Sequence, residues 1–163
     1  MGTIRANPIA KPSILVYNRG INHCRLCRRK RGRMQYRKLG QTGLTISRLG
    51  FGGIPIQRID AEGTKALIQK LKEAGVNYID TARGYTVSES YLGQALEGMR
   101  DHFVLATKSM ARTKQAMAAD IETSLTNLKT DYIDLYQVHN PNMEQLEQVT
   151  APGGALEALV EAR

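Results

Sequence analysis

The stretch NYIDTARGYTVSESYLGQAL, residues 77–96, decides the fold, because it places a carboxylate at the end of a buried strand. The apolar run before Asp80 is typical of a short strand with both faces covered. Tyr85 follows five residues later, in an expected loop. The apolar spacing from Ser88 onward is typical of a helix. The stretch therefore predicts a strand, a loop and a helix, with an acid and a tyrosine at the junction.

Two later segments have the same organisation. FVLATK, residues 103–108, is an apolar run that ends in Lys108, and YIDLYQVH, residues 132–139, ends in His139. Three successive expected strands thus end on ionisable side chains. Because parallel strands bring their C-terminal ends to one edge, these side chains are expected to converge with Tyr85.

Strands and helices alternate along the rest of the chain. A hairpin is expected to turn at GQTG, residues 40–43, and to precede a strand that ends in glycines. Helices are expected from about Asp60, Ser88 and Thr113, with Asp60 as the N-cap of the first helix and Gly75 at its typical stop position. Their predicted apolar stripes are Leu67, Ile68, Leu71 and Ala74; then Tyr91, Leu92, Ala95 and Leu96; then Met117, Ile121, Leu125 and Leu128. Two further helical segments are expected at 142–149 and 154–162, separated by Pro152-Gly153-Gly154.

Strict alternation predicts an α/β protein with a parallel sheet covered by helices. Two architectures fit, an open doubly wound sheet and a (β/α)8 TIM-type barrel. A glycine-rich phosphate fingerprint is missing after the first strand, where GFGGIP matches it poorly. The N-terminal hairpin suits the bottom of a barrel. Both observations favour the barrel, of which the chain is expected to supply about the first four β/α units.

The net charge of +8 is concentrated in one part of the chain. Residues 1–33 hold nine lysines and arginines and no acidic residue, whereas residues 34–163 are nearly neutral. We therefore expect a basic, disordered extension over 1–33 and a globular domain over 34–163. Cys24 and Cys27 form a CxxC in the extension, but no second ligand pair exists for a four-ligand zinc site, so no metal site is predicted.

The strand-end residues have complementary chemistry. Tyrosine is a weak acid, and a nearby ammonium such as Lys108 strengthens it by stabilising the phenolate. Asp80 can pair with that lysine, and His139 can donate a hydrogen bond to a substrate oxygen. Such a set suits proton delivery to a carbonyl oxygen. Each residue alone also fits a structural role. Asp134, inside the last expected strand, is interpreted as a structural acid, and His102 as a surface residue.

The motifs together resemble the aldo-keto reductase family. They are LGFGG at 49–53, NYIDTARGY at 77–85, ATK at 106–108 and DYIDLYQVHNP at 131–141. The resemblance covers Met34 to about Pro141. GGIPIQRI, at 52–59, further resembles a bacterial subgroup that carries a C-terminal iron–sulfur module, which this sequence does not contain.

The resemblance implies an NADPH-dependent oxidoreductase that reduces aldehydes or ketones without a metal. Tyr85 would be the general acid, Lys108 and Asp80 would tune it, and His139 would orient the carbonyl. Gly53, Ile54 and Asp80 would lie near the nicotinamide. The family's grip on the adenosine phosphates would come from the second half of the barrel, so the cofactor site is expected to be incomplete in this chain.

A complete barrel of this type needs ~250 residues, and this chain has 163. One alternative is therefore an inactive half-barrel that needs a complementing chain, with self-association through open sheet edges. Another is nucleic-acid binding through the basic extension, which the near-neutral domain disfavours. Because no apolar run approaches the ~20 residues that span a bilayer, a cytoplasmic protein without membrane contact is expected.

Overall fold

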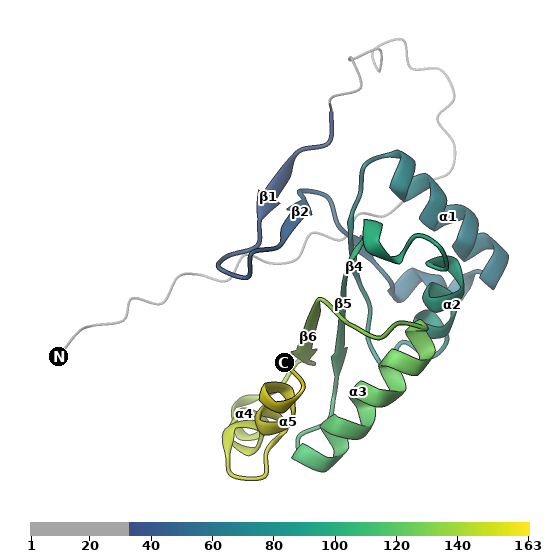
Figure 1. The fold of residues 1–163 in the computed structure, drawn as a ribbon. Helices are drawn as coiled ribbons and strands as arrows, with labels where there is room; N and C mark the ends of the chain where they lie inside the picture. Colours follow the sequence, from purple (N-terminus) through teal and green to yellow (C-terminus); the bar gives the residue numbers. More distant parts are fainter. Residues whose placement is uncertain (1–32) are drawn as a thin grey trace. The chain divides into compact units, whose positions relative to one another are not determined.

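The structure is a computed structural model, and it describes residues 33–163 (Figure 1). The basic extension expected over 1–33, with its CxxC, lies outside the described residues apart from Arg33. Within residues 33–163, no helix combines the length and the apolar character that crossing a membrane requires.

The N-terminal hairpin is confirmed. Strand β1 (Tyr36–Lys38) pairs antiparallel with β2 (Thr45–Ser47), and the turn between them contains Gly40 and Gly43, both at positive φ. Asn77 ties the hairpin to the main sheet, because its side-chain oxygen accepts the Ser47 N–H at 2.6 Å. Asn77 immediately precedes a strand of that sheet, so the hairpin contacts the sheet at the edge where its parallel strands begin.

The main sheet has four parallel strands. They are β3 (Phe51–Gly52), β4 (Tyr78–Asp80), β5 (Val104–Ser109) and β6 (Leu135–Val138). Their order in the sheet is β3-β4-β5-β6, so each strand pairs with the next one along the chain. A doubly wound sheet reverses its strand order at a switch point, whereas a barrel adds strands sequentially. The observed order is that of a barrel.

Three helices follow the first three strands of this sheet. They are α1 (Ala61–Glu73), α2 (Ser88–Ala95) and α3 (Lys114–Leu128), and Figure 1 shows them along one side of β4 and β5. The predicted N-cap is confirmed at Asp60, whose side chain accepts the Gly63 N–H at 2.7 Å. Thr113 caps α3 in the same way. These caps satisfy donors that the first helical turn would otherwise leave unpaired.

Two short helices follow β6. Helix α4 (Met143–Thr150) begins with a capping box in which Asn142 and Gln145 bond reciprocally to each other's backbone. Helix α5 (Ala155–Glu161) starts after Gly154 and packs on α3 through a small core. That core consists of Met117, Val149, Ala155 and Ala158.

The larger core lies between the sheet and helices α1 to α3. Its buried members are Ile56, Ile68, Ile79, Leu92, Ala95, Leu96, Phe103, Leu105 and Leu128. Most of the predicted apolar stripes contribute to the two cores. Three stripe residues do not: Leu67 and Leu125 are partly exposed and belong to neither core, and Ala74 is the exposed C-cap of α1.

One strand is shorter than the sequence predicts. The segment expected to be extended from Tyr132 enters the sheet only at Leu135. Asp134 precedes the strand, and its carboxylate accepts the Leu105 N–H at 2.9 Å and the Arg100 guanidinium at 2.7 Å. The expectation that Asp134 is a structural acid fits these contacts, although the residue lies outside the strand.

Candidate active site

Asp80 and Lys108 form an ion pair at the C-terminal edge of the sheet. Asp80 is the last residue of β4, and Lys108 lies near the end of the neighbouring β5. The Lys108 ammonium donates to Asp80 Oδ1 and, at 2.8 Å, to the carbonyl oxygen of Thr81. The lysine side chain is 14% exposed and the aspartate 33%, so the pair borders solvent without being freely hydrated. This geometry fixes the ammonium at the edge of the sheet.

Tyr85 lies beside this ion pair. It is in the loop between β4 and α2, and the Lys108 Nζ atom is 5.2 Å from the centre of its ring. The next residue, Thr86, has a φ of 43°, which β-branched residues rarely adopt. The Thr86 hydroxyl donates to Gln57 Oε1 at 3.0 Å, a contact that holds this part of the loop.

His139 completes the group from the far side. It directly follows β6, and its backbone N–H donates to the Ser109 carbonyl at 2.7 Å. The His139 ring meets the Tyr85 ring edge-on, with centroids 5.9 Å apart. The structure thus brings together Asp80, Tyr85, Lys108 and His139, as the strand-end argument expects.

The imidazole of His139 is held in its neutral form near neutral pH. Burial lowers the pKa of His139 below its ordinary value of 6.5, and the Lys108 ammonium lowers this pKa further. The Asp80 carboxylate opposes this effect to a smaller extent. A neutral imidazole keeps one N–H for donation to a substrate oxygen.

Gly53 and Ile54 follow β3 and lie at the same edge. The Gly53 N–H donates to the Asp80 carbonyl at 2.7 Å. A Cβ at position 53 would lie 2.9 Å from Ser88 Oγ and 3.0 Å from Thr81 Oγ1, so a larger residue there would force these buried hydroxyls to shift. Ile54 begins a 3-10 helix (Ile54–Arg58), and its side chain is 55% exposed. This end of β3 therefore offers an apolar surface beside the Asp80 backbone.

Two contacts of the site were missed by the sequence argument. Gln137 Nε2 donates to Asp80 Oδ2 at 3.3 Å, and Arg112 Nη2 donates to the His139 carbonyl at 2.9 Å. The alternation of side chains along a strand could have revealed Gln137, which is two residues before His139 and therefore on the same face. No sequence signal marks Arg112, which follows β5 in a loop.

The arrangement suits proton donation to an oxygen. A phenol, an ammonium and a neutral imidazole face one another, and a carboxylate balances the ammonium. Between residues 33 and 163, no three histidine, cysteine or acidic side chains gather as metal ligands would. A hollow of about 370 Å³ between α3 and α5 is lined by residues such as Ala118, Ala158 and Glu161 and contains none of the four strand-end groups.

Comparison with known proteins gives one consistent family. The model of the aldo/keto reductase family matches residues 48–162. The Bacillus subtilis oxidoreductase YqkF is 37% identical over 127 residues, which are 68% of this chain and 40% of that protein. The chain therefore spans less than half the length of this relative.

Solved structures give the same result. The holo form of an aldo-keto reductase from Bacillus halodurans matches with a TM-score of 0.70 and 32% identity, over 78% of this chain and 46% of that one. An aldo/keto reductase from Klebsiella pneumoniae, solved in complex with NADP and acetate, matches with a TM-score of 0.62 and 30% identity, over 73% of this chain and 43% of that one. These likenesses confirm the predicted α/β fold of the TIM-barrel type.

Proposed function

Because this chain belongs to the aldo/keto reductase family, we infer that its strand-end site reduces aldehyde or ketone carbonyls to alcohols, with NADPH as cofactor. The observation that carries the proposal is the convergence of Tyr85 with Lys108 and His139 at one edge of the sheet. The family is one of oxidoreductases, and the relative from Klebsiella pneumoniae was solved with NADP.

Tyr85 serves as the general acid in this proposal. As negative charge develops on the carbonyl oxygen, the phenol gives up its proton to that oxygen. Lys108 stabilises the phenolate that remains, and Asp80 holds the ammonium in place. His139 donates a hydrogen bond that orients the carbonyl. These roles divide the reaction among groups that the structure places together.

The end of β3 fits the nicotinamide part of the cofactor. The exposed Ile54 offers an apolar surface there, and Gly53 bonds through its backbone N–H to the carbonyl of Asp80, whose carboxylate lies at the same edge of the sheet. When bound, the nicotinamide supplies a hydride to the carbonyl carbon. In this proposal, the described part of the chain holds the nicotinamide end of the cofactor.

A second candidate is a half-barrel that works only with a complementing chain. Within the described residues, β3 pairs only with β4 and β6 pairs only with β5. Each outer strand therefore has one edge without a neighbour, and such edges favour pairing with another strand. A second copy of this chain, or a chain that supplies the remaining strands, would satisfy them.

One experiment separates the two candidates. NADPH oxidation is followed with a panel of small aldehydes, both for the 163-residue chain and for a chimaera. In the chimaera, residues 48–162 replace the matching segment of the Klebsiella pneumoniae enzyme. Turnover by both proteins supports a self-sufficient reductase, and turnover by the chimaera alone supports the half-barrel. Turnover by neither protein would overturn the proposed function, and NADH in place of NADPH tests the cofactor preference.

A further inference from the structure

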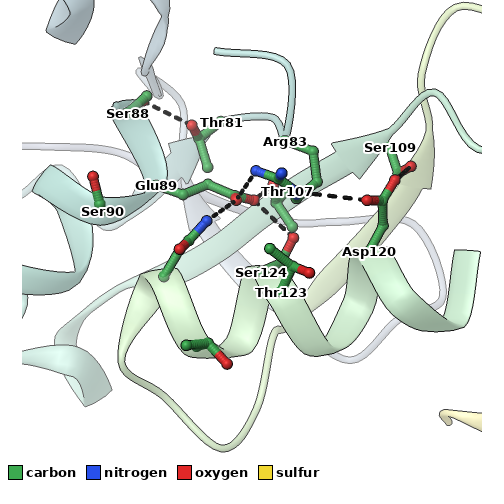
Figure 2. A network of polar contacts seen from close by, with 12 residues as sticks. Thr81, Arg83, Ser88, Glu89, Ser90, Thr107, Ser109, Asp120, Thr123 and Ser124 are labelled. Atoms are coloured by element: carbon green, nitrogen blue, oxygen red, sulfur yellow. Dashed lines mark hydrogen bonds and ion pairs between the residues drawn. The ribbon is translucent and has the colours of Figure 1, made fainter. Parts of the chain in front are cut away.

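Glu89 is a fully buried carboxylate that the proposed reaction does not use. It lies in the first turn of α2 and is 1% exposed. Figure 2 shows the side chains of Arg83, Thr107 and Ser124 gathered around it. It accepts from Thr107 and Ser124 at 2.8 Å each, from Arg83 at 3.2 Å and from Asn127 at 3.3 Å. A buried charge is costly unless donors compensate it, and four donors do so here.

The donors to Glu89 fall into two groups. Ser124 and Asn127 come from α3, on the outer layer. Thr107 and Arg83 come from segments that carry the strand-end site. Thr107 directly precedes Lys108 in β5, and Arg83 lies two residues before Tyr85 in the β4–α2 loop. The Glu89 carboxylate therefore joins the two segments that present the lysine and the tyrosine.

A second carboxylate extends the connection. Arg83 Nε lies 3.6 Å from Asp120 Oδ1, and Asp120 also accepts the hydroxyl hydrogen of Ser109 (Figure 2). Ser109 directly follows Lys108 in β5. Thr107 and Ser109, the two sequence neighbours of this lysine, are thus both bonded to the same polar network. The backbone N–H of Arg83 also donates to the backbone carbonyl of Lys108 at 2.9 Å.

The network acts from the opposite face of the sheet. Successive side chains of a strand point to opposite faces, so Thr107 and Ser109 face the helices while Lys108 faces the site. We propose that Glu89 and Asp120, through Arg83, Thr107 and Ser109, are positioning residues that fix Lys108 against Tyr85. This inference rests on the proposed function for its effect on turnover, but its geometric content does not depend on activity.

The test compares donors from the two groups. Thr107→Val and Ser124→Ala each remove one hydroxyl that Glu89 accepts from, but only Thr107 adjoins Lys108. The 163-residue chain is labelled with 3-fluorotyrosine, and the Tyr85 fluorine signal is assigned with Tyr85→Phe. Thr107→Val should shift the Tyr85 signal, and Thr107→Ser should restore it. Ser124→Ala should leave the Tyr85 signal unmoved. It should instead shift the signal of Tyr136, whose hydroxyl lies 3.2 Å from the Ser124 hydroxyl.

Activity provides an independent readout. In the chimaera, Thr107→Val should lower kcat about ten-fold with KM and cofactor affinity unchanged, because a small misplacement of catalytic groups affects the chemical step. Thr107→Ser should restore kcat. An unmoved Tyr85 signal in Thr107→Val, or an equal shift in Ser124→Ala, would overturn the positioning role. If the unsubstituted chimaera shows no turnover, the proposed function fails, and the fluorine spectra still decide the inference.

Discussion

At the scale of single residues, the neutral His139 makes the stability of the protein depend on pH. Burial and the Lys108 ammonium lower its pKa in the folded chain, so the unfolded chain binds a proton more readily as pH falls below 6.5. Stability should therefore decrease from neutral pH into the acid range. His139→Gln should make this decrease shallower in urea unfolding measured at several pH values. An unchanged slope would contradict the assignment, and the other two histidines are present in both proteins.

Asp134 offers a test of a structural role beside the site. Its carboxylate accepts the Leu105 N–H and the Arg100 guanidinium, and its side chain is 16% exposed. Asp134→Ala leaves the Leu105 N–H without its acceptor and removes one acceptor of Arg100, so it should lower the free energy of unfolding by about 1–3 kcal/mol. Denaturant unfolding measures the loss. The matched control is Asp131→Ala at an exposed position, and an equal loss there would refute the assigned contacts.

Single residues also show where sequence reasoning succeeds. The convergence of Asp80, Lys108 and His139 was predictable, because parallel strands align their C-terminal ends. The burial of Glu89 was not predictable, because a glutamate in the first turn of a helix usually faces solvent and stabilises the helix dipole. Its four donors come from distant parts of the sequence, so only the folded structure brings them together.

At the scale of elements, a glycine sets the distance between two helices. A Cβ on Gly93 of α2 would collide with the backbone of Asn127 and Leu128 in α3. Gly93→Ala should therefore force the helices apart and destabilise the protein by about 1–3 kcal/mol. Thermal unfolding provides the measurement. Gly84→Ala is the control, because a Cβ there would meet no atom within 4 Å, and equal effects would contradict the packing argument.

Strand β6 carries a second pH-dependent group. Burial raises the pKa of Tyr136 to about 12, while its hydrogen bond with Ser124 acts in the opposite direction. The unfolded chain loses this proton near pH 10, so stability should fall as pH rises from about 10 towards 12. Tyr136→Phe should reduce that alkaline loss, as measured by urea unfolding across this range. The same loss in both proteins would show that the phenol is not the group responsible.

The elements themselves were mostly predictable from periodicity and caps, as at Asp60 and Thr113. The start of β6 was not, because Tyr132 and Ile133 have the apolar character of a strand. The Asp134 carboxylate, rather than a backbone carbonyl, accepts the Leu105 N–H just before the strand begins. A side chain that replaces a backbone acceptor has no signature in a pattern of apolar and polar residues.

At the scale of the whole molecule, the outer strands of the sheet predict self-association. In the described residues, β3 and β6 each have one neighbour, so one row of backbone donors and acceptors on each is open to another strand. A preparation of the 163-residue chain should therefore form oligomers whose mass rises with protein concentration in light scattering. A monomer at every concentration would contradict this prediction. Shortening the chain to residues 34–163 is the control for contacts made by the basic extension.

The central claim is that Tyr85 donates the proton to a carbonyl oxygen at the edge of the sheet. The most direct measurement is the single-turnover rate of NADPH oxidation by the chimaera, compared with its Tyr85→Phe variant at saturating aldehyde. The substitution keeps the ring beside Lys108 and removes only the hydroxyl. The rate should fall on the order of 10²-fold or more, with NADPH affinity unchanged. Equal rates in the two proteins would contradict the account.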